Sequence, residues 1–257
     1  MTKSKNIFYL LLIAGTLFSS CKKNLVTEAP KRLVKFFNSS VPAEATTFKY
    51  DTQGRLIDET SPYAGYKFAY TNNVFSGSYT DQNNNTPYVY SNGKLDKNGR
   101  LLQVDGLYTP QNGPSSSHKY VFTYDANGYL IKTTQTDITD NIVSEDTYTY
   151  NNGDLVSDIN TYNGQPNYTM EYEYFDNLSN KLSMDINQTV FGFFSDGLTG
   201  KRSKDLLKEE RSYDIQNVKQ LDYIFQYKLD NDVFPVSYTA QNLVNNAQWG
   251  RGFEYNK

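Results

Sequence analysis

The chain has 257 residues and a formal net charge of −3, and it contains one cysteine and one histidine. One cysteine excludes an internal disulfide, and one histidine excludes a metal site built from several histidines. The slightly acidic balance argues against nucleic acid as a partner, and no motif in the chain indicates a cofactor.

Residues 1–20 have the pattern of a secretory signal peptide. Lys3 and Lys5 provide the charged start, an apolar run extends from Ile7 to Ala14, and Leu17-Phe-Ser-Ser-Cys21 ends the segment. The apolar run is too short to cross a bilayer. We therefore expect this leader to be removed from the mature protein.

Cys21 follows the leader in a sequence that resembles the lipobox of bacterial lipoproteins, in which the cysteine is acylated and becomes the new N-terminus. Two or three acyl chains anchor a protein stably in a membrane. The alternative is an ordinary signal peptide in which the cysteine is incidental. We expect residues 21–30 to be a lipidated tether, and the protein to be a cell-envelope lipoprotein of the outer membrane, with its periplasmic or outer orientation open.

The remainder, residues 31–257, is expected to be a single domain that repeats one short pattern, an aromatic pair two positions apart. The eight occurrences are Phe48/Tyr50, Tyr66/Phe68/Tyr70, Tyr88/Tyr90, Tyr120/Phe122/Tyr124, Tyr148/Tyr150, Tyr172/Tyr174, Tyr223/Phe225/Tyr227 and Phe253/Tyr255. Side chains two positions apart share one face of a β-strand, and aromatic residues suit such a pleated surface. The pattern therefore predicts an all-β domain with one aromatic face.

The stretch from Phe122 to Ile131 indicates how these strands are joined. Asp125 can accept a hydrogen bond from a backbone N–H two residues on, and Gly128 can take the positive φ that closes a bulged hairpin. Related turn signals occur at Asp51-Thr-Gln-Gly54 and Asp96-Lys-Asn-Gly99, and a short apolar pair follows each of them. We expect one hairpin per repeat.

The alternation fades between residues 177 and 207, where we expect a crossover loop with one helical turn. The rest of the pattern predicts an antiparallel meander of about 14 strands, and open sheets rarely exceed ~10 strands without curling or closing. We therefore expect a rolled or closed barrel, round or flattened, with the aromatic face inside.

The opposite face carries Lys49, Lys67, Lys119, Glu171 and Glu173. Most strands are expected to have roughly six to eight residues, whereas a membrane-spanning strand needs about 9 to 11 with one face suited to lipid. These two features predict a water-soluble barrel on a lipid tether rather than a spanning porin.

The stretches Tyr50-Asp-Thr-Gln-Gly-Arg-Leu56 and Tyr124-Asp-Ala-Asn-Gly-Tyr-Leu130 resemble the YD-repeat (RHS-like) unit of large shell-forming toxin and adhesion proteins. Together with the lipobox, the Lys31-Arg-Leu-Val start and Ser203-Lys-Asp-Leu-Leu207, they make the mature chain resemble an uncharacterised family of Gram-negative cell-envelope lipoproteins. That resemblance implies a porin-like β fold and an envelope location, and it carries no catalytic residues. Turns such as Asn72-Asn73 depart from the unit, so the hairpins need not be equivalent.

Evidence for catalysis is weak in the sequence. His118 follows the polar loop 109–117 and is predicted to be a surface residue. The carboxylates alternate with aromatic residues or flank turns, which predicts solvated faces; they include Asp58, Glu59, Glu145, Asp146, Glu171, Glu173, Glu209 and Glu210. The Asp-x-x-Gly turns lack the ligand spacing of a calcium loop. We therefore predict no catalytic or metal-ligating residue and no enzymatic activity.

Three functions fit this description. The favoured one is a module that binds a glycan, a peptide or a partner protein through the loops 109–117 and 197–205, since function tends to lie on loops over a rigid scaffold. A polysaccharide hydrolase would need two carboxyl groups that converge about 5 to 10 Å apart in one cleft. A structural or adhesion module would have no pocket. The sequence leaves the oligomeric state open, and also whether the barrel interior is filled.

Overall fold

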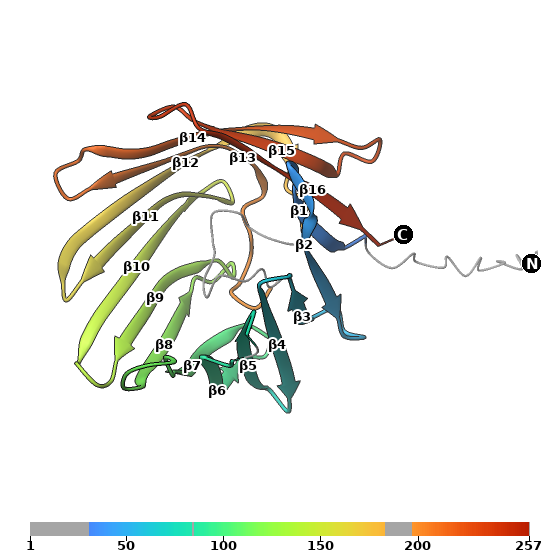
Figure 1. Cartoon of the computed structure of the whole chain (residues 1–257). Helices are drawn as coiled ribbons and strands as arrows, with labels where there is room; N and C mark the ends of the chain where they lie inside the picture. Colours follow the sequence, from blue (N-terminus) through green and yellow to red (C-terminus); the bar gives the residue numbers. More distant parts are fainter. Residues whose placement is uncertain (1–30, 84, 183–196, 257) are drawn as a thin grey trace, which may run out of the picture. The chain divides into compact units, whose positions relative to one another are not determined.

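The computed structural model describes residues 31–83, 85–182 and 197–256, and these ranges form a closed antiparallel β-barrel without helices (Figure 1). Each strand pairs with its neighbours in sequence, and the barrel closes where the first strand pairs with the last. The predicted all-β barrel is thus confirmed. The predicted leader and tether, with Cys21, lie outside the described residues.

The described ranges contain sixteen strands instead of the expected 14 or so. They are β1 Leu33–Asn38, β2 Val41–Tyr50, β3 Leu56–Thr60, β4 Ala64–Thr71, β5 Val74–Asp81, β6 Tyr88–Leu95, β7 Leu101–Tyr108, β8 Ser116–Tyr124, β9 Leu130–Asp137, β10 Ile142–Asn151, β11 Asp154–Tyr162, β12 Gln165–Ser179, β13 Asp205–Asp214, β14 Lys219–Leu229, β15 Pro235–Asn242 and β16 Gln248–Tyr255. The eight aromatic motifs occupy every even-numbered strand. The odd-numbered return strands carry no such motif, which is why the sequence pattern undercounted them.

A repeated aspartate turn joins many of these strands. In each copy the aspartate N–H donates to the carbonyl four residues on, and its Oδ1 accepts from the N–H groups two and four residues on, as Asp96 does with Asn98 and Arg100. The fourth residue of the turn has a positive φ, which is 81° at Gly99 and 95° at Gly128. The bulged turn predicted for Asp125 to Gly128 is therefore confirmed.

Each Asp-x-x-Gly turn is followed by one leucine that is sealed from solvent, and then by a β-bulge. Leu56, Leu101 and Leu130 are no more than 1% exposed. The register shifts directly beside each of them, because one extra residue sits on the return strand. A bulge exchanges the two faces of the strand beyond it. This exchange decides which polar residues of the return strands face inward.

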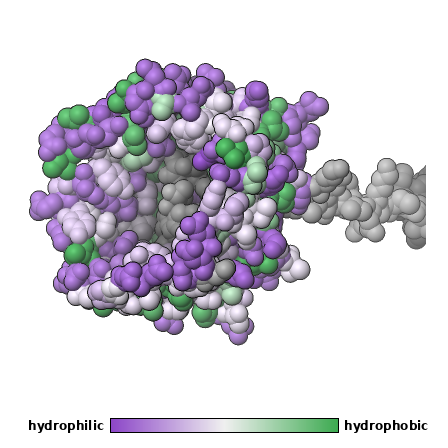
Figure 2. All heavy atoms as spheres, viewed as in Figure 1, coloured by the Kyte–Doolittle hydropathy of each residue, from purple (hydrophilic) through white to green (hydrophobic). Residues whose placement is uncertain are grey.

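The aromatic motifs form the inner lining of the barrel. Their rings contact aromatic rings on the neighbouring strands, as Phe68 does with Phe75 at 5.9 Å and Phe225 with Tyr238 at 5.6 Å. Residues between them, such as Lys67, are exposed. Figure 2, which looks toward one end of the barrel, shows mostly hydrophilic residues with scattered hydrophobic ones on that face. Burial of each ring stabilises the fold by about 1.5 to 3 kcal/mol, so the lining is the principal core.

Residues 197–204, which lead into β13, run along the barrel end that holds most of the aspartate turns. Leu198 accepts a hydrogen bond from the Leu101 N–H, Lys201 donates to the Gly128 carbonyl, and Lys204 donates to the Gly153 carbonyl. Part of the predicted crossover loop is therefore tied to three hairpins. The expected helical turn falls largely on residues 183–196, which lie outside the described residues.

Strand length does not distinguish this barrel from one that spans a membrane. Most strands have eight to eleven residues, and β12 has fifteen. Eight of the sixteen described strands have the expected six to eight residues, and seven are longer because hairpin pairing continues past the aromatic motif to the turn. The side-chain chemistry of the outer wall is therefore a better guide to lipid contact than strand length.

Candidate functional site

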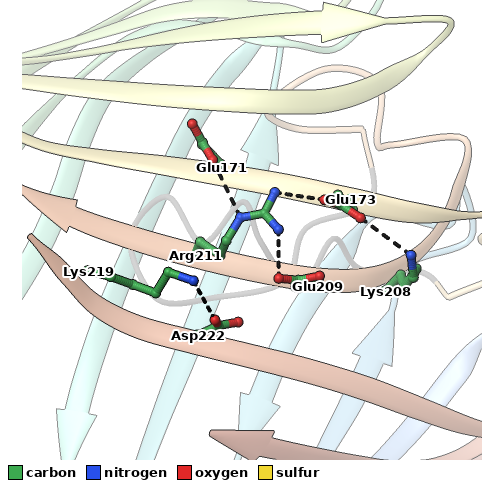
Figure 3. Close-up of polar contacts among 7 residues, drawn as sticks. All are labelled: Glu171, Glu173, Lys208, Glu209, Arg211, Lys219 and Asp222. Carbon is green, nitrogen blue, oxygen red and sulfur yellow. Dashed lines mark hydrogen bonds and ion pairs between the residues drawn. The ribbon is translucent and has the colours of Figure 1, made fainter. Parts of the chain in front are cut away.

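The carboxylates predicted to be solvated divide between the two sides of the barrel wall. On the outer side of β12 and β13, Arg211 contacts Glu171 at 3.4 Å, Glu173 at 2.8 Å and Glu209 at 2.6 Å (Figure 3). The Glu173 carboxylate also accepts from Lys208 at 3.4 Å. These ion pairs hold the pKa of Glu173 below its usual value, chiefly through the hydrogen bond from Arg211.

Three carboxylates on the predicted solvated faces are instead largely buried. Glu59 is 9% exposed, and burial raises the pKa of both Asp146 and Glu210. For Asp146 the sequence held the signal, because it stands two positions before Tyr148 and must share its face. For Glu59 the bulge after Leu56 reverses the expected facing. The prediction of solvated faces was wrong for these three residues.

Asp146 on β10 is held by a polar network on the inner wall. Asn160 Nδ2 donates to Asp146 Oδ1 at 2.7 Å, and the Tyr168 hydroxyl donates to the same oxygen at 3.2 Å. Asn167 Nδ2 in turn donates to Asn160 Oδ1 at 2.8 Å, which fixes the orientation of the Asn160 amide. Burial is the largest influence on the pKa of Asp146 and raises it, while the bonds from Asn160 and Tyr168 oppose the rise.

Asp158 on β11 lies in the middle of this surface. It pairs with Tyr148 on β10 and with Met170 on β12, so Asp146 and Tyr172 are its diagonal neighbours. Its side chain is 9% exposed, and its buried Oδ1 has no hydrogen-bond partner among the described residues. Burial, and then the charge of Asp146, raises the pKa of Asp158 to about 7.

Neither Asp158 nor Asn160 was predicted as a site residue, because the bulge after Leu155 changes which residues of β11 face inward. Beyond that bulge Ile159 faces outward and is 45% exposed, while the polar residues on either side of it face inward. Hydrophobic alternation read from the sequence places Ile159 inside. The only available signal was the turn Asn152-Gly153, which predicts a bulge but not its consequence for facing.

The inner acidic wall is defined here as Asp146, Asp158, Asn160, Tyr148, Tyr168, Tyr172 and Glu210. Burial raises the pKa of Glu210 to about 7, and burial together with the charges of Asp158 and Glu210 raises the pKa of Tyr172. The surface thus combines three carboxyl groups, one amide and three phenols. Such a set can donate and accept hydrogen bonds, stack on a ring and attract positive charge.

His118 lies on the inner face of β8 and not on the surface as predicted, since its side chain is only 11% exposed. Its Nε2 is 3.1 Å from Ser116 Oγ, and its Nδ1 is 3.8 Å from Asp137 Oδ2. Ser116, His118 and Asp137 thus lie in the order of a Ser-His-Asp catalytic triad. The distance to Asp137 is too long for a hydrogen bond, so the imidazole is not oriented by that carboxylate.

The two loops expected to carry a partner differ in setting. Residues 109–115 are mostly exposed, and Ser116 and Ser117 already belong to β8. Gly197 and residues 200–204, together with Asn180, line a pocket of about 340 Å³. The Tyr174 hydroxyl contacts Ser203 Oγ there at 2.9 Å. Polar side chains therefore gather at this loop as well as on the inner wall.

Metal ligation finds no support in the described ranges, where no group of three or more His, Cys, Asp or Glu side chains could hold an ion. Those ranges likewise contain no helix long and apolar enough to cross a membrane. Cys21 cannot be assessed, because it precedes the described part of the chain.

Two solved structures share this fold. A porin-like protein from Bacteroides uniformis ATCC 8492 matches with a TM-score of 0.63 and 15% sequence identity, over 87% of this chain and 96% of that chain. A porin-like protein from Bacteroides vulgatus ATCC 8482 matches with a TM-score of 0.64 and 12% identity, over 88% of this chain and 99% of that chain. No family model and no curated protein matches the sequence. The expected porin-like β fold is therefore confirmed, while the lipoprotein family and the YD-repeat unit stay predictions.

Proposed function

We propose that this chain is a lipid-anchored protein of the cell envelope whose barrel binds a ligand and does not catalyse a reaction. The leader followed by Cys21 supports the anchor. The shared fold with porin-like proteins of Bacteroides supports an envelope location, and a place in the outer membrane is consistent with both. The ligand class that fits best is a hydroxyl-rich molecule such as a glycan, with a peptide or a partner protein as the other options.

The observation that carries this proposal is Asp158 Oδ1 on the inner acidic wall, which is buried and has no hydrogen-bond partner among the described residues. A buried polar atom without a partner destabilises the fold by about 1 to 3 kcal/mol. Folded proteins retain such an atom where it has a role in recognition or chemistry. Asp146, Tyr168 and Asn160 beside it offer the hydrogen-bonding groups that recognise hydroxyls, and tyrosine rings stack on sugar rings.

The outer wall supports a barrel that stands in water beside its membrane. Arg211 and its three glutamates lie on β12 and β13 at the outer side of the wall (Figure 3). Placing an arginine or lysine of a barrel against the lipid midplane costs about 2 to 4 kcal/mol. A wall that met lipid at this position would bury the whole network, so the proposal assigns membrane attachment to Cys21.

Glycan binding can be tested with the purified full-length protein on an array of envelope and dietary glycans. We expect discrete hits that are lost in Asp158→Asn and Tyr168→Phe and retained in Glu254→Gln, whose carboxylate pairs with Lys35 on the outer wall. The contradicting result is that Asp158→Asn and the parent protein bind the same glycans, the same peptides and the same pulled-down proteins. The inner wall would then have no role in binding.

A second candidate is a polysaccharide hydrolase that uses Asp146 and Asp158. Diagonal neighbours on adjacent strands lie about 7 to 8 Å apart, which is within the range for a carboxylate pair that inverts a glycosidic bond. A carboxyl group whose pKa is raised to about 7 beside a second carboxyl group also suits an acid and a base. Release of nitrophenol from aryl glycosides that is abolished by Asp158→Asn would favour this candidate over simple binding.

A further inference from the structure

We propose that the inner acidic wall recognises a protonated amine, so that its ligand is an amino sugar or another amine-bearing molecule held between Asp146 and Asp158 among tyrosine side chains. This inference rests on the proposed binding function and narrows the chemistry of that same site. It follows from three features of the wall: its charge, its spacing and its aromatic content.

Charge is the first feature. Within the described ranges, no lysine or arginine forms an ion pair or hydrogen bond with Asp146, Asp158 or Glu210. The outer wall differs, because Arg211 and Lys208 balance its glutamates. A buried carboxylate needs a counter-charge or must take up a proton. A cationic ligand would supply the charge that the inner wall lacks.

Spacing is the second feature, and it favours an ammonium group over a metal ion. A metal ion needs three or more ligands converging on one point, and the described residues provide no such group of acids. Two carboxylates at diagonal positions, about 7 to 8 Å apart, leave room for one ammonium between them. Its three N–H donors can reach both carboxylates and a phenol.

Aromatic content is the third feature. Asp158 faces Tyr148 across the β10–β11 pair, and Tyr168 and Tyr172 are its diagonal neighbours on β12. The titration of all three phenols is affected by the charge of Asp158, which places these groups close together. The faces of tyrosine rings attract a cation electrostatically. Carboxylates and rings together select an amine over a neutral hydroxyl.

Calorimetric titration of the full-length protein in detergent micelles tests this directly, with glucosamine and N-acetylglucosamine as paired ligands and cadaverine as an amine without a sugar ring. We expect glucosamine to bind at least tenfold more tightly than N-acetylglucosamine at pH 7. Asp158→Asn and Asp146→Asn should each weaken glucosamine binding at least tenfold. Glu254→Gln, which removes one carboxylate from the outer wall, should change nothing.

Two outcomes would overturn the inference. Equal affinity for glucosamine and N-acetylglucosamine would leave glycan binding in place but remove the amine. Failure of both glucosamine and cadaverine to bind the parent protein would also rule out recognition of an amine. If neutral glycans then bind on the array, the proposed glycan-binding function still holds. Asparagine keeps the size of aspartate and removes a buried charge, so loss of binding in these variants should not reflect unfolding; a melting curve of each variant checks this.

Discussion

Val233 and Asn217 occupy the same fourth position in two equivalent aspartate turns, with φ angles of 63° and 61°. In the turns that begin at Asp51 and Asp96 this position holds glycine. Asparagine tolerates the left-handed region, whereas a β-branched side chain at positive φ is strained. Val233, in the turn before β15, therefore has a backbone conformation that valine disfavours.

Replacing Val233 by asparagine should stabilise the protein by about 1 kcal/mol, because the left-handed backbone costs roughly 1 to 2 kcal/mol for an ordinary L-residue. For a domain of this size that corresponds to a rise in melting temperature of about 2 to 4 °C. The matched reverse change, Asn217→Val, should lower the melting temperature by a similar amount. We therefore expect the melting temperature to rise in Val233→Asn and to fall in Asn217→Val. A loss of stability in Val233→Asn would contradict the assigned backbone strain.

The outer-wall network makes a second prediction. Arg211 is 19% exposed and pairs with three glutamates, so Arg211→Met leaves those carboxylates facing one another with Lys208 and Lys219 as the nearby cations (Figure 3). We expect a loss of about 1 to 2 kcal/mol at pH 7, since solvent screens charges on the outer wall. Unfolding in urea measures the loss.

Protonation provides the control for that variant. At pH 4 the glutamates begin to lose their charge, so the deficit of Arg211→Met relative to the parent protein should shrink. Lys35→Met removes an exposed pair with Glu254 and should change stability by less than about 0.5 kcal/mol at either pH. A deficit that stays constant from pH 7 to pH 4 would assign the role of Arg211 to packing of its aliphatic stem instead of charge.

How far the sequence predicts this structure depends on the bulges. Period-two aromatic pairs such as Tyr148 and Tyr150 predict the even-numbered strands and the inner lining, and turn chemistry predicts the hairpins, because both depend on local sequence. The inner acidic wall was not predictable in the same way. One extra residue after Leu155 exchanges Ile159 with its polar neighbours, and such a shift becomes visible only in the paired register.

Hydrogen bonds between side chains on different strands are the other feature that the sequence pattern does not predict. Asp146 could be placed on the face of Tyr148 by counting residues. That Asn160 and Tyr168 both donate to its carboxylate depends on the register of three strands. The same holds for the position of Asp158, whose buried carboxylate lies beside Asp146 and tyrosine side chains of two neighbouring strands.

Lipidation of Cys21 is a third prediction. Cells expressing the protein and fed an alkyne analogue of palmitate should label the parent protein, and Cys21→Ser should lose the label and appear in the soluble fraction. Asn24→Ala, which changes the tether but not the acceptor, should stay labelled and membrane-bound. Retention of Cys21→Ser in carbonate-washed membranes would mean that another part of the chain attaches the protein.

The pH dependence of stability gives the sharpest test of the inner wall in the absence of ligand. The pKa of Asp158 is raised to about 7 in the folded protein, against about 3.9 when the chain is unfolded. Between these values the folded state binds more protons than the unfolded state, so the free energy of unfolding falls as pH rises. From pH 5 to pH 7.5 this residue alone should remove about 2 kcal/mol.

Asp158→Asn should remove this contribution and leave that of Glu210, whose pKa is also raised to about 7. The variant should therefore nearly equal the parent protein at pH 5 and exceed it by about 2 kcal/mol at pH 7.5. Glu173→Gln is the matched control, because Arg211 holds the pKa of Glu173 low and its titration lies below this window. That variant should shift the whole curve without changing its slope. If the parent protein and Asp158→Asn show parallel curves from pH 5 to pH 7.5, then Asp158 is ionised and compensated in the folded state, and the charge argument for an amine ligand falls with it.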